Sequence, residues 1–418
     1  MAVIARSDDL RRHNQRRILQ ALRRHGPMSR TELSGATSLS ASTVTAITAA
    51  LLDSAILVET PATDTALSRR GRPQVTLALN PATASIGALS LSLNRISAAV
   101  VDYAGNVVNE VVDRFPTRNA DVHALATALA GTLHAAQASC PEPPGPLRHI
   151  SIGVQGVTDS EGTTMLWSPI TRHTNLSLAR MLEAEFNVPV SVANDCSMIA
   201  QALRWRELDR FGASFAAVLL SHGIGMGLFV NGGLLSGIGS SATEFGHMTY
   251  LNDGALCRCG RPGCVEAYAG DYAIWRAAHR LDPQSPPVED LDPGMMHALA
   301  EKARSHDGPE REAYREAGRA IGTALRSMFA LFDPFPVAFV GTGAAAFDLL
   351  EGPIREAIGQ SAIGMATSQV EMHCFSDEFP LVRDGAAISA LNTLDNNMFA
   401  SAEPQEAGRT ERRLGHAV

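Results

Sequence analysis

Apolar residues recur with a helical period in three short segments near the N-terminus. Residues 8–24 predict a first helix, which ends before a Gly-Pro pair. Ser29 followed by Glu32 forms a capping-box pattern for a second helix, and Ser40 is the expected N-cap of a third. The turn between the second and third helices is short, so this segment predicts a helix-turn-helix.

Two apolar runs, 56–58 and 75–77, follow the helices and predict a two-stranded ribbon. Three helices followed by a ribbon indicate a winged helix-turn-helix over residues 1–80, with an arginine-rich arm between its strands. The small hydroxyl residues of the third helix and the arginines of the arm suit phosphate, base-edge and minor-groove contacts. The alternative is a three-helix packing domain with a solvated arginine run. The DNA-binding candidates are Arg30, Ser40, Ser42, Thr43, Thr45, Arg70 and Arg72.

Beyond residue 80, strand-like runs alternate with helical patterns, which predicts an α/β body in two halves. Expected strands are 84–93, 95–101, 107–113, 149–154, 189–193, 215–221, 226–230 and 337–340. Expected helices are 119–137, 176–186, 197–206, 267–279, 295–305, 309–331 and 384–396. We expect a body over 81–396, with one lobe of 81–196 plus 384–396 and a second lobe of 197–383. Residues 397–418 are expected to form a disordered tail.

Composition and charge narrow the class of protein. Hydrophobic residues make up 45% of the chain and charged residues 19%, which is typical of a globular protein. No apolar run reaches 18 residues, and the arginine-rich start lacks the apolar core of a secretory signal. Residues 1–80 hold 11 arginines and six acidic residues, whereas the remainder holds 24 basic and 37 acidic residues. A basic head on an acidic body favours a DNA-binding head on a soluble sensor or enzyme, although a short segment can carry such an excess by chance. The lack of a membrane span or signal and the low number of cysteines predict a cytoplasmic, nucleoid-associated bacterial protein without membrane contact.

Three cysteines, Cys257, Cys259 and Cys264, lie within eight residues and are separated by turn-forming glycines. His247, ten residues before the first of them, is the natural fourth ligand for a tetrahedral zinc ion. Four protein ligands leave no open position, so the expected Zn²⁺ is structural. The alternative is three buried free cysteines and a core histidine.

Polar side chains surround this segment. Glu244 precedes His247 by three residues, Glu266 follows Cys264 by two, and Asn194 and Asp195 end an expected strand. Carboxylates and amides that converge on a pocket suit a polyhydroxylated ligand, although ordinary surface acids would give the same spacing. The glycine-rich stretch 221–227 lacks the lysine and helix start of a P-loop and is a weak phosphate signal.

The stretch from Gly223 through Glu244-Phe245-Gly246-His247 to the Cys-x-Cys-x4-Cys motif and Glu266 resembles the ROK family of repressors, open reading frames and sugar kinases. The resemblance covers about residues 10–396. It implies a two-lobed, actin-like sugar-kinase fold and a zinc site of His247, Cys257, Cys259 and Cys264. It also implies a sugar pocket of Asn194, Asp195, Glu244, His247 and Glu266. The head is similar to that of the transcription-factor branch, which includes xylose and N-acetylglucosamine repressors.

Departures from the kinase pattern decide between the branches. Family kinases carry Asp-x-Gly-Gly-Thr where this chain has the stretch 90–94, and Gly-Thr-Gly where it has 221–223. Leu93 and His222 should crowd a nucleotide phosphate, although Asp195, the base of the family kinases, is present. We therefore expect a non-enzymatic repressor of carbohydrate genes that binds operator DNA as a homodimer or homotetramer and responds to a sugar or sugar phosphate. The alternatives are an ATP-dependent sugar kinase with a fused head and a DNA-binding protein controlled by a partner protein.

Overall fold

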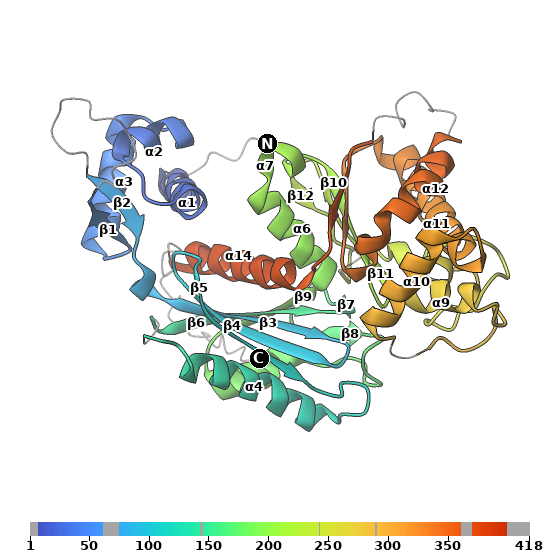
Figure 1. Ribbon diagram of the computed structural model, residues 1–418. Coiled ribbons are helices and arrows are strands. Elements are labelled where there is room, and N and C mark those ends of the chain that lie inside the picture. The colour runs from blue at the N-terminus through green and yellow to red at the C-terminus, as the bar shows by residue number, and fades with distance from the viewer. Residues whose placement is uncertain are drawn as a thin grey trace, which may run out of the picture.

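The computed structural model describes residues 7–61, 75–142, 145–241, 243–288, 291–360 and 370–398. Figure 1 shows a head and two sheet-containing lobes. The head contains α1 (Ser7–His25), α2 (Arg30–Thr37), α3 (Ala41–Asp53), β1 (Leu57–Thr60) and β2 (Thr76–Leu79). The two strands pair antiparallel with Leu57 opposite Leu79. The winged helix-turn-helix expected from the sequence is therefore present.

Local chemistry explains the helix starts in the head. The Ser29 side chain accepts from the Glu32 backbone N–H, and the Glu32 carboxylate accepts from the Ser29 N–H, which completes the capping box. The Ser40 hydroxyl caps α3 by accepting from the Thr43 N–H. On α3, Val44, Ile47 and Leu51 are buried, and this apolar face holds the helix against α1 and α2.

Lobe I is a five-stranded sheet in the order β5-β4-β3-β6-β9. Its strands are β3 (Ser85–Ser92), β4 (Arg95–Asp102), β5 (Val107–Arg114), β6 (Leu147–Val154) and β9 (Val190–Asn194), with a small hairpin of β7 (Val157–Thr158) and β8 (Met165–Trp167). The helices α4 (Val122–Ala138) and α5 (Leu178–Phe186) cover one face of the sheet. The other face packs against α14 (Phe379–Met398), so the central strands β3, β4 and β6 are buried on both faces, whereas the edge strand β5 is partly exposed (Figure 1).

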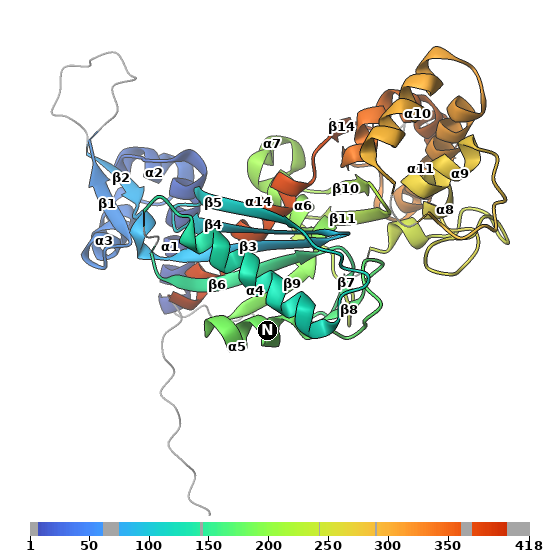
Figure 2. The same ribbon diagram turned by 60° about the horizontal axis from the view of Figure 1, so that its bottom comes forward.

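Lobe II holds a second five-stranded sheet in the order β12-β11-β10-β13-β14. Its strands are β10 (Phe215–Leu220), β11 (Ile224–Val230), β12 (Gly233–Leu234), β13 (Val337–Val340) and β14 (Met372–Phe375). Its helices are α8 (Glu266–Ala269), α9 (Asp271–Ala278), α10 (Pro293–Ser305), α11 (Pro309–Phe332) and α12 (Phe347–Gly359), with 3-10 turns at Phe245–His247 and Thr342–Ala346; a further 3-10 turn, Pro81–Thr83, lies between β2 of the head and β3 of lobe I. Figure 2 shows these helices gathered at the far end of the molecule from the head.

Two packed helices, α6 (Asp195–Arg206) and α14, connect the lobes with the head. After α6, α7 (Leu208–Phe211) leads into the second sheet. A single apolar cluster runs from Ile18 and Leu22 of α1 through Leu203 of α6 to Leu391 of α14. The head is therefore packed on the body by a continuous core.

The structure corrects several expected boundaries. The expected helix 267–279 is two helices, because Gly270 has an extended backbone (φ −71°, ψ 155°) between α8 and α9. The last helix begins at Phe379 rather than at 384, and α12 and β14 were missed. Arg70, Arg72 and residues 399–418 lie outside the described residues. In the described part, no single helix is long and apolar enough to cross a membrane. The pair α2 and α3 would reach the required length and apolar composition only if the two helices were taken together, and the chain bends by 116° between them.

Candidate functional site

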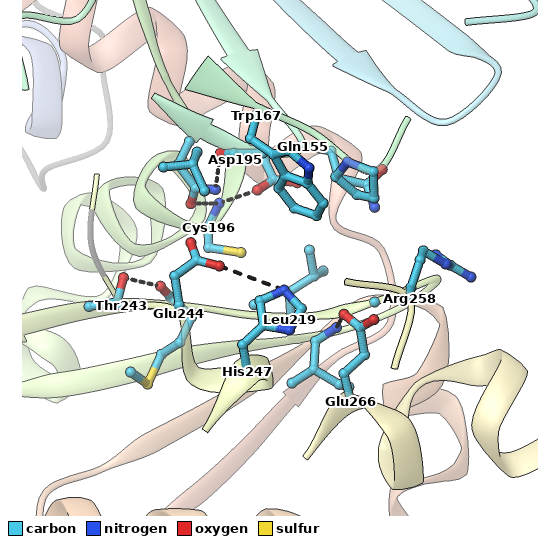
Figure 3. Close-up of a pocket in the computed structure, with 18 residues that line it drawn as sticks. Gln155, Trp167, Asp195, Cys196, Leu219, Thr243, Glu244, His247, Arg258 and Glu266 are labelled. Carbon is cyan, nitrogen blue, oxygen red and sulfur yellow. Dashed lines mark hydrogen bonds and ion pairs between the residues drawn. The ribbon is translucent and has the colours of Figure 1, made fainter. Parts of the chain in front are cut away.

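A pocket opens between the two lobes where strands of both sheets end (Figure 3). Lobe I contributes the segment after β6 and the junction of β9 with α6, whereas lobe II contributes the start of β11, the turn at 245–247 and the start of α8. The cavity is about 70 Å³ and is lined by 18 residues. All five residues expected to bind sugar, Asn194, Asp195, Glu244, His247 and Glu266, lie in this lining.

Asn194 fixes the junction between β9 and α6. Its Oδ1 caps α6 by accepting from the backbone N–H groups of Cys196 (2.9 Å) and Ser197 (3.2 Å). Its Nδ2 donates to the Gly156 carbonyl at 2.8 Å, which ties the loop after β6 to the same corner. Asn194 therefore shapes the pocket wall, and its amide already has three partners.

Asp195 is the first residue of α6 and its side chain faces the cavity (Figure 3). Its Oδ1 accepts from the Cys196 N–H at 2.8 Å. Burial raises the pKa of Asp195 to about 7, and the nearby Glu378 carboxylate adds to that rise against the hydrogen bonds to the backbone. A carboxyl group with this pKa is suited to accept or donate a hydrogen bond to a ligand hydroxyl near neutral pH.

His247 lies between the pocket and the cysteine cluster. Its Nε2 is 3.7 Å from Glu244 Oε2, and its Nδ1 is 3.7 Å from Cys257 Sγ. The side chain of Glu244 is 46% exposed, so this carboxylate is accessible to a ligand in the cleft. The two ring nitrogens thus face different groups, and a metal held through Nδ1 would leave Nε2–H to orient Glu244.

Glu266 begins α8 and is buried. Its Oε2 accepts from the Ile224 N–H at 3.2 Å, and its Oε1 accepts from the Tyr272 hydroxyl at 3.3 Å. Cys257 Sγ lies 3.6 Å from the same Oε1. Glu266 therefore links the start of β11 with the cysteine cluster while it lines the cavity.

The four residues expected to bind metal come together. Their ligand atoms all lie within 4.8 Å of one another, and all three cysteines are free thiols. The sulfur atoms of Cys259 and Cys264 are 3.8 Å apart. Zn–S bonds of about 2.3 Å in a tetrahedron require a sulfur–sulfur distance of about 3.8 Å. The donor set and spacing therefore fit a tetrahedral metal with His247 as fourth ligand.

The glycine-rich stretch after β10 serves close packing. A Cβ at Gly225 would fall 2.4 Å from Cys196 Sγ, and one at Gly227 would fall 2.2 Å from the Cys196 carbonyl oxygen. A Cβ at Gly223 would lie 2.8 Å from Glu266 Oε2. These glycines let β11 approach the start of α6, which brings the two walls of the pocket together.

Further lining residues that the sequence patterns do not predict include Gln155, Trp167, Cys196 and Arg258. Trp167 ends β8 and its ring lies 6.3 Å from the His247 ring, in an edge-on arrangement. Arg258 stacks over the Tyr272 ring at 4.8 Å and donates to the His222 carbonyl at 2.9 Å. Of these four, only Arg258 lies inside a motif that the sequence makes visible, because it stands between Cys257 and Cys259.

Leu93 and His222, which we expected to crowd a nucleotide phosphate, line one cavity between the lobes together with Arg95 and Asp292. Leu93 and Asn94 form the turn between β3 and β4, and Asn94 has a positive φ of 53°. Leu93 of lobe I and His222 of lobe II therefore border the same cavity.

The DNA-binding candidates in the described head lie on or beside α3. Ser42 and Thr45 are exposed, whereas Thr43 is half-buried and its hydroxyl lies 2.8 Å from that of Ser40. Arg30 donates to the Thr48 hydroxyl and lies 3.9 Å from Glu59, so it braces α2 against α3 and the wing. Its guanidinium is thus already engaged within the head.

Fold and site together define a two-lobed α/β binding protein with a winged helix-turn-helix head. The winged helix-turn-helix DNA-binding family matches residues 11–54, and the ROK family matches residues 87–380. The chain belongs to the ROK family.

Individual relatives include regulators and an enzyme. The xylose repressor of Caldicellulosiruptor bescii is 26% identical over 347 residues, covering 81% of this chain and 85% of the repressor. A glucokinase of Streptomyces coelicolor is 29% identical over 255 residues, covering 57% of this chain and 76% of the kinase. A solved ROK-family transcriptional regulator, described as a homologue of the Escherichia coli Mlc protein, has a TM-score of 0.75 and 23% identity, covering 93% of this chain and 98% of its own.

Proposed function

We propose that this protein is a sugar-responsive transcriptional regulator, and more specifically a repressor of carbohydrate-utilisation genes. The observation that carries the proposal is one chain with a winged helix-turn-helix and a pocket of three carboxyl groups, Asp195, Glu244 and Glu266. Carboxylates accept hydrogen bonds from sugar hydroxyls, and burial strengthens the hydrogen bonds that Asp195 and Glu266 would form. The similarity to a xylose repressor, which covers 81% of this chain, supports the same function.

We assign DNA binding and sugar binding to the two expected domains. Residues 1–80 would bind operator DNA, with Ser42 and Thr45 on the exposed side of α3 and Arg70 and Arg72 on the wing. Residues 81–396 would bind a sugar or a sugar phosphate between the lobes. Operator half-sites have a fixed spacing, so we propose that two or four copies of the chain act together.

We also propose that His247, Cys257, Cys259 and Cys264 hold a structural Zn²⁺. The distances within the cluster and its three free thiols, of which Cys257 and Cys264 are buried, support this assignment. The metal would fix the turn that carries Glu244 relative to the start of the helix that carries Glu266. Sugar recognition would then depend on the metal, because the metal positions the residues that bind the sugar.

Sugar binding would act on the head by a shift between two arrangements of the lobes. α6 starts in the pocket at Asp195 and reaches the head at Trp205, over which the Arg24 guanidinium lies at 4.5 Å. α14 packs along α6 and holds Arg23 of the head through Asp395. Closure of the cleft would therefore move the helices on which the head rests, and operator affinity would change by the same free energy as sugar affinity.

A sugar kinase is the second candidate, because Asp195 is placed at the pocket and a cavity of about 220 Å³ lies beside Thr342 and Gly343. We infer from the family resemblance that Leu93 and His222 take the places of the phosphate loops, which would favour the regulator.

The test is a thermal-shift and calorimetric screen of the zinc-loaded full chain against free sugars, amino sugars and sugar phosphates, with and without ATP. We expect one sugar to bind with or without ATP and to change the affinity of a selected operator fragment. Sugar-dependent ADP release that disappears in Asp195→Asn would establish the kinase instead. The absence of any sugar effect on stability or DNA affinity would contradict the sugar-responsive regulator.

A further inference from the structure

Another cavity lies at the joint between the head and the body, where α1, α6 and α14 meet (Figure 1). Its volume is about 320 Å³. Arg24 belongs to the head, Arg204 and Trp205 come from α6, and Asn392 comes from α14. Among the described residues that line the cavity, none is acidic.

Arg24 has no hydrogen-bond or ion-pair partner among the described residues. Its Nε is buried without an acceptor, and its guanidinium lies over the Trp205 ring at 4.5 Å. Burial and the positive charge of Arg204 both lower the pKa of Arg24. A half-buried guanidinium that faces another cation is costly unless an anion accompanies it.

Arg204 carries the second positive charge. Its Nε donates to the Gly212 carbonyl at 3.2 Å, and its guanidinium lies over the Phe229 ring at 5.2 Å. In the described structure it forms no ion pair. The ring and the carbonyl orient the guanidinium but do not neutralise it.

The arginines close to Arg24 and Arg204 in the chain have carboxylate partners. Arg23, next to Arg24, forms an ion pair with Asp395, and Arg206, two residues beyond Arg204, forms one with Asp384. The two arginines of the cavity are thus left without a carboxylate in a region where adjacent arginines have one. Uncompensated positive charge in a concave, partly apolar site is the expected property of an anion-binding site.

We propose that this cavity binds a small organic phosphate monoester. Such a group carries nearly two negative charges at neutral pH, which matches the two guanidinium groups. Guanidinium groups donate paired hydrogen bonds to phosphate oxygens. The Gln20 Nε2 donates to Asn392 Oδ1 at 3.5 Å, which orients the Asn392 amide so that its Nδ2 can supply a further donor. Trp205 and Ile388 provide an apolar wall for the organic part of the ligand.

This cavity, unlike the sugar pocket, includes residues of the head. Its walls come from the head and from the body, so the complete site exists only while α1 rests on α6 and α14. A bound phosphate ester therefore stabilises the docked head and changes operator affinity independently of sugar.

The test uses the zinc-loaded full chain in phosphate-free buffer, with phenyl phosphate and inorganic phosphate as probes in calorimetric titrations and thermal shifts. We expect one phenyl phosphate per chain to bind, and inorganic phosphate to bind more weakly because it lacks the apolar part. Arg24→Met and Arg204→Met should each weaken binding at least tenfold. Arg355→Met, which changes an exposed arginine of α12, should leave binding unchanged.

Two results would overturn the proposal. One is no saturable binding of either probe up to about 10 mM. The other is binding that survives both substitutions, which would place the anion elsewhere, for example between the lobes. Arg204 lies in the body, so its variant tests the site even if Arg24→Met disturbs the packing of the head.

Discussion

The Arg23 guanidinium of the head and the Asp395 carboxylate near the end of α14 form an ion pair at 2.8 Å, with side chains only 4% and 2% exposed. The Tyr103 hydroxyl donates to the same carboxylate at 2.8 Å, and Arg23 lies over the Tyr103 ring at 5.2 Å. Residues 372 and 292 positions apart in the chain thus meet in one buried polar cluster. This cluster joins the head to both the sheet of lobe I and its covering helix.

Asp395→Asn should destabilise the protein and loosen the head. It leaves the Arg23 charge buried without a counter-charge, which costs about 3 kcal/mol in comparable sites. Denaturant unfolding measures this loss. Glu351→Gln, which breaks an exposed pair with Arg355, should cost less than about 1 kcal/mol. Equal losses of unfolding free energy in Asp395→Asn and Glu351→Gln would mean that the buried ion pair stabilises the joint no more than an exposed pair does.

Cys257→Ser should remove the metal and the sugar response together. The thiolate is one of four donors, and its loss frees the turn that positions Glu244 and His247. Elemental analysis should find one zinc per wild-type chain and per Cys374→Ser chain, because Cys374 is exposed and outside the cluster. A Cys257→Ser protein with no zinc and normal sugar affinity would refute the coupling of metal and pocket.

Glu244→Gln should weaken sugar binding by tenfold or more and leave the unfolding free energy nearly unchanged. The side chain is 46% exposed and lies toward the cleft, so its loss removes a charged acceptor for a ligand hydroxyl without disturbing the core. Calorimetric titration with the sugar found by the screen measures the effect. Glu161→Gln, at an exposed turn of lobe I, is the matched control, and an equal loss there would argue against a direct contact.

Asp195→Asn should stabilise the protein increasingly as pH rises. The pKa of Asp195 is raised to about 7 by burial, so the folded state keeps a proton that the unfolded chain releases near pH 4. Between about pH 4 and pH 7 the unfolding free energy of the wild type therefore falls relative to that of the variant. Above about pH 7 the difference between the two unfolding free energies stays constant. Melting temperatures of both proteins between pH 5.5 and 8.5 measure it; a constant difference would contradict the raised pKa.

Ser42→Glu should separate DNA binding from stability. Ser42 is exposed in the first turn of α3, where a negative charge favours the helix but repels DNA phosphates. We expect operator affinity to fall at least tenfold while the melting temperature holds or rises. Ser327→Glu places the same charge on α11 at an exposed position far along the body and should change neither. Unchanged operator affinity in Ser42→Glu would remove α3 from the interface.

Local signals in the sequence were sufficient for much of the fold. The caps at Ser29 and Ser40, the helical stripe of α3 and the alternation of strands and helices depend on neighbours a few residues apart. The cysteine motif was equally readable, because ligand spacing and turn glycines are local. The break at Gly270 escaped notice because the apolar pattern continues across it while Gly270 itself is extended.

The sequence by itself determined the winged head, the α/β body in two halves and the ligand set of the candidate metal site, since each is encoded by short-range periodicity or spacing; the residues of the candidate sugar site came from the resemblance to the ROK family. Only the tertiary structure decided which distant groups share an environment. It placed Trp167 beside His247, committed the Asn194 amide to a helix cap, paired Arg23 with Asp395 and left Arg24 facing Arg204. Burial and charge neighbours arise from packing between elements far apart in the chain, and no local pattern records them.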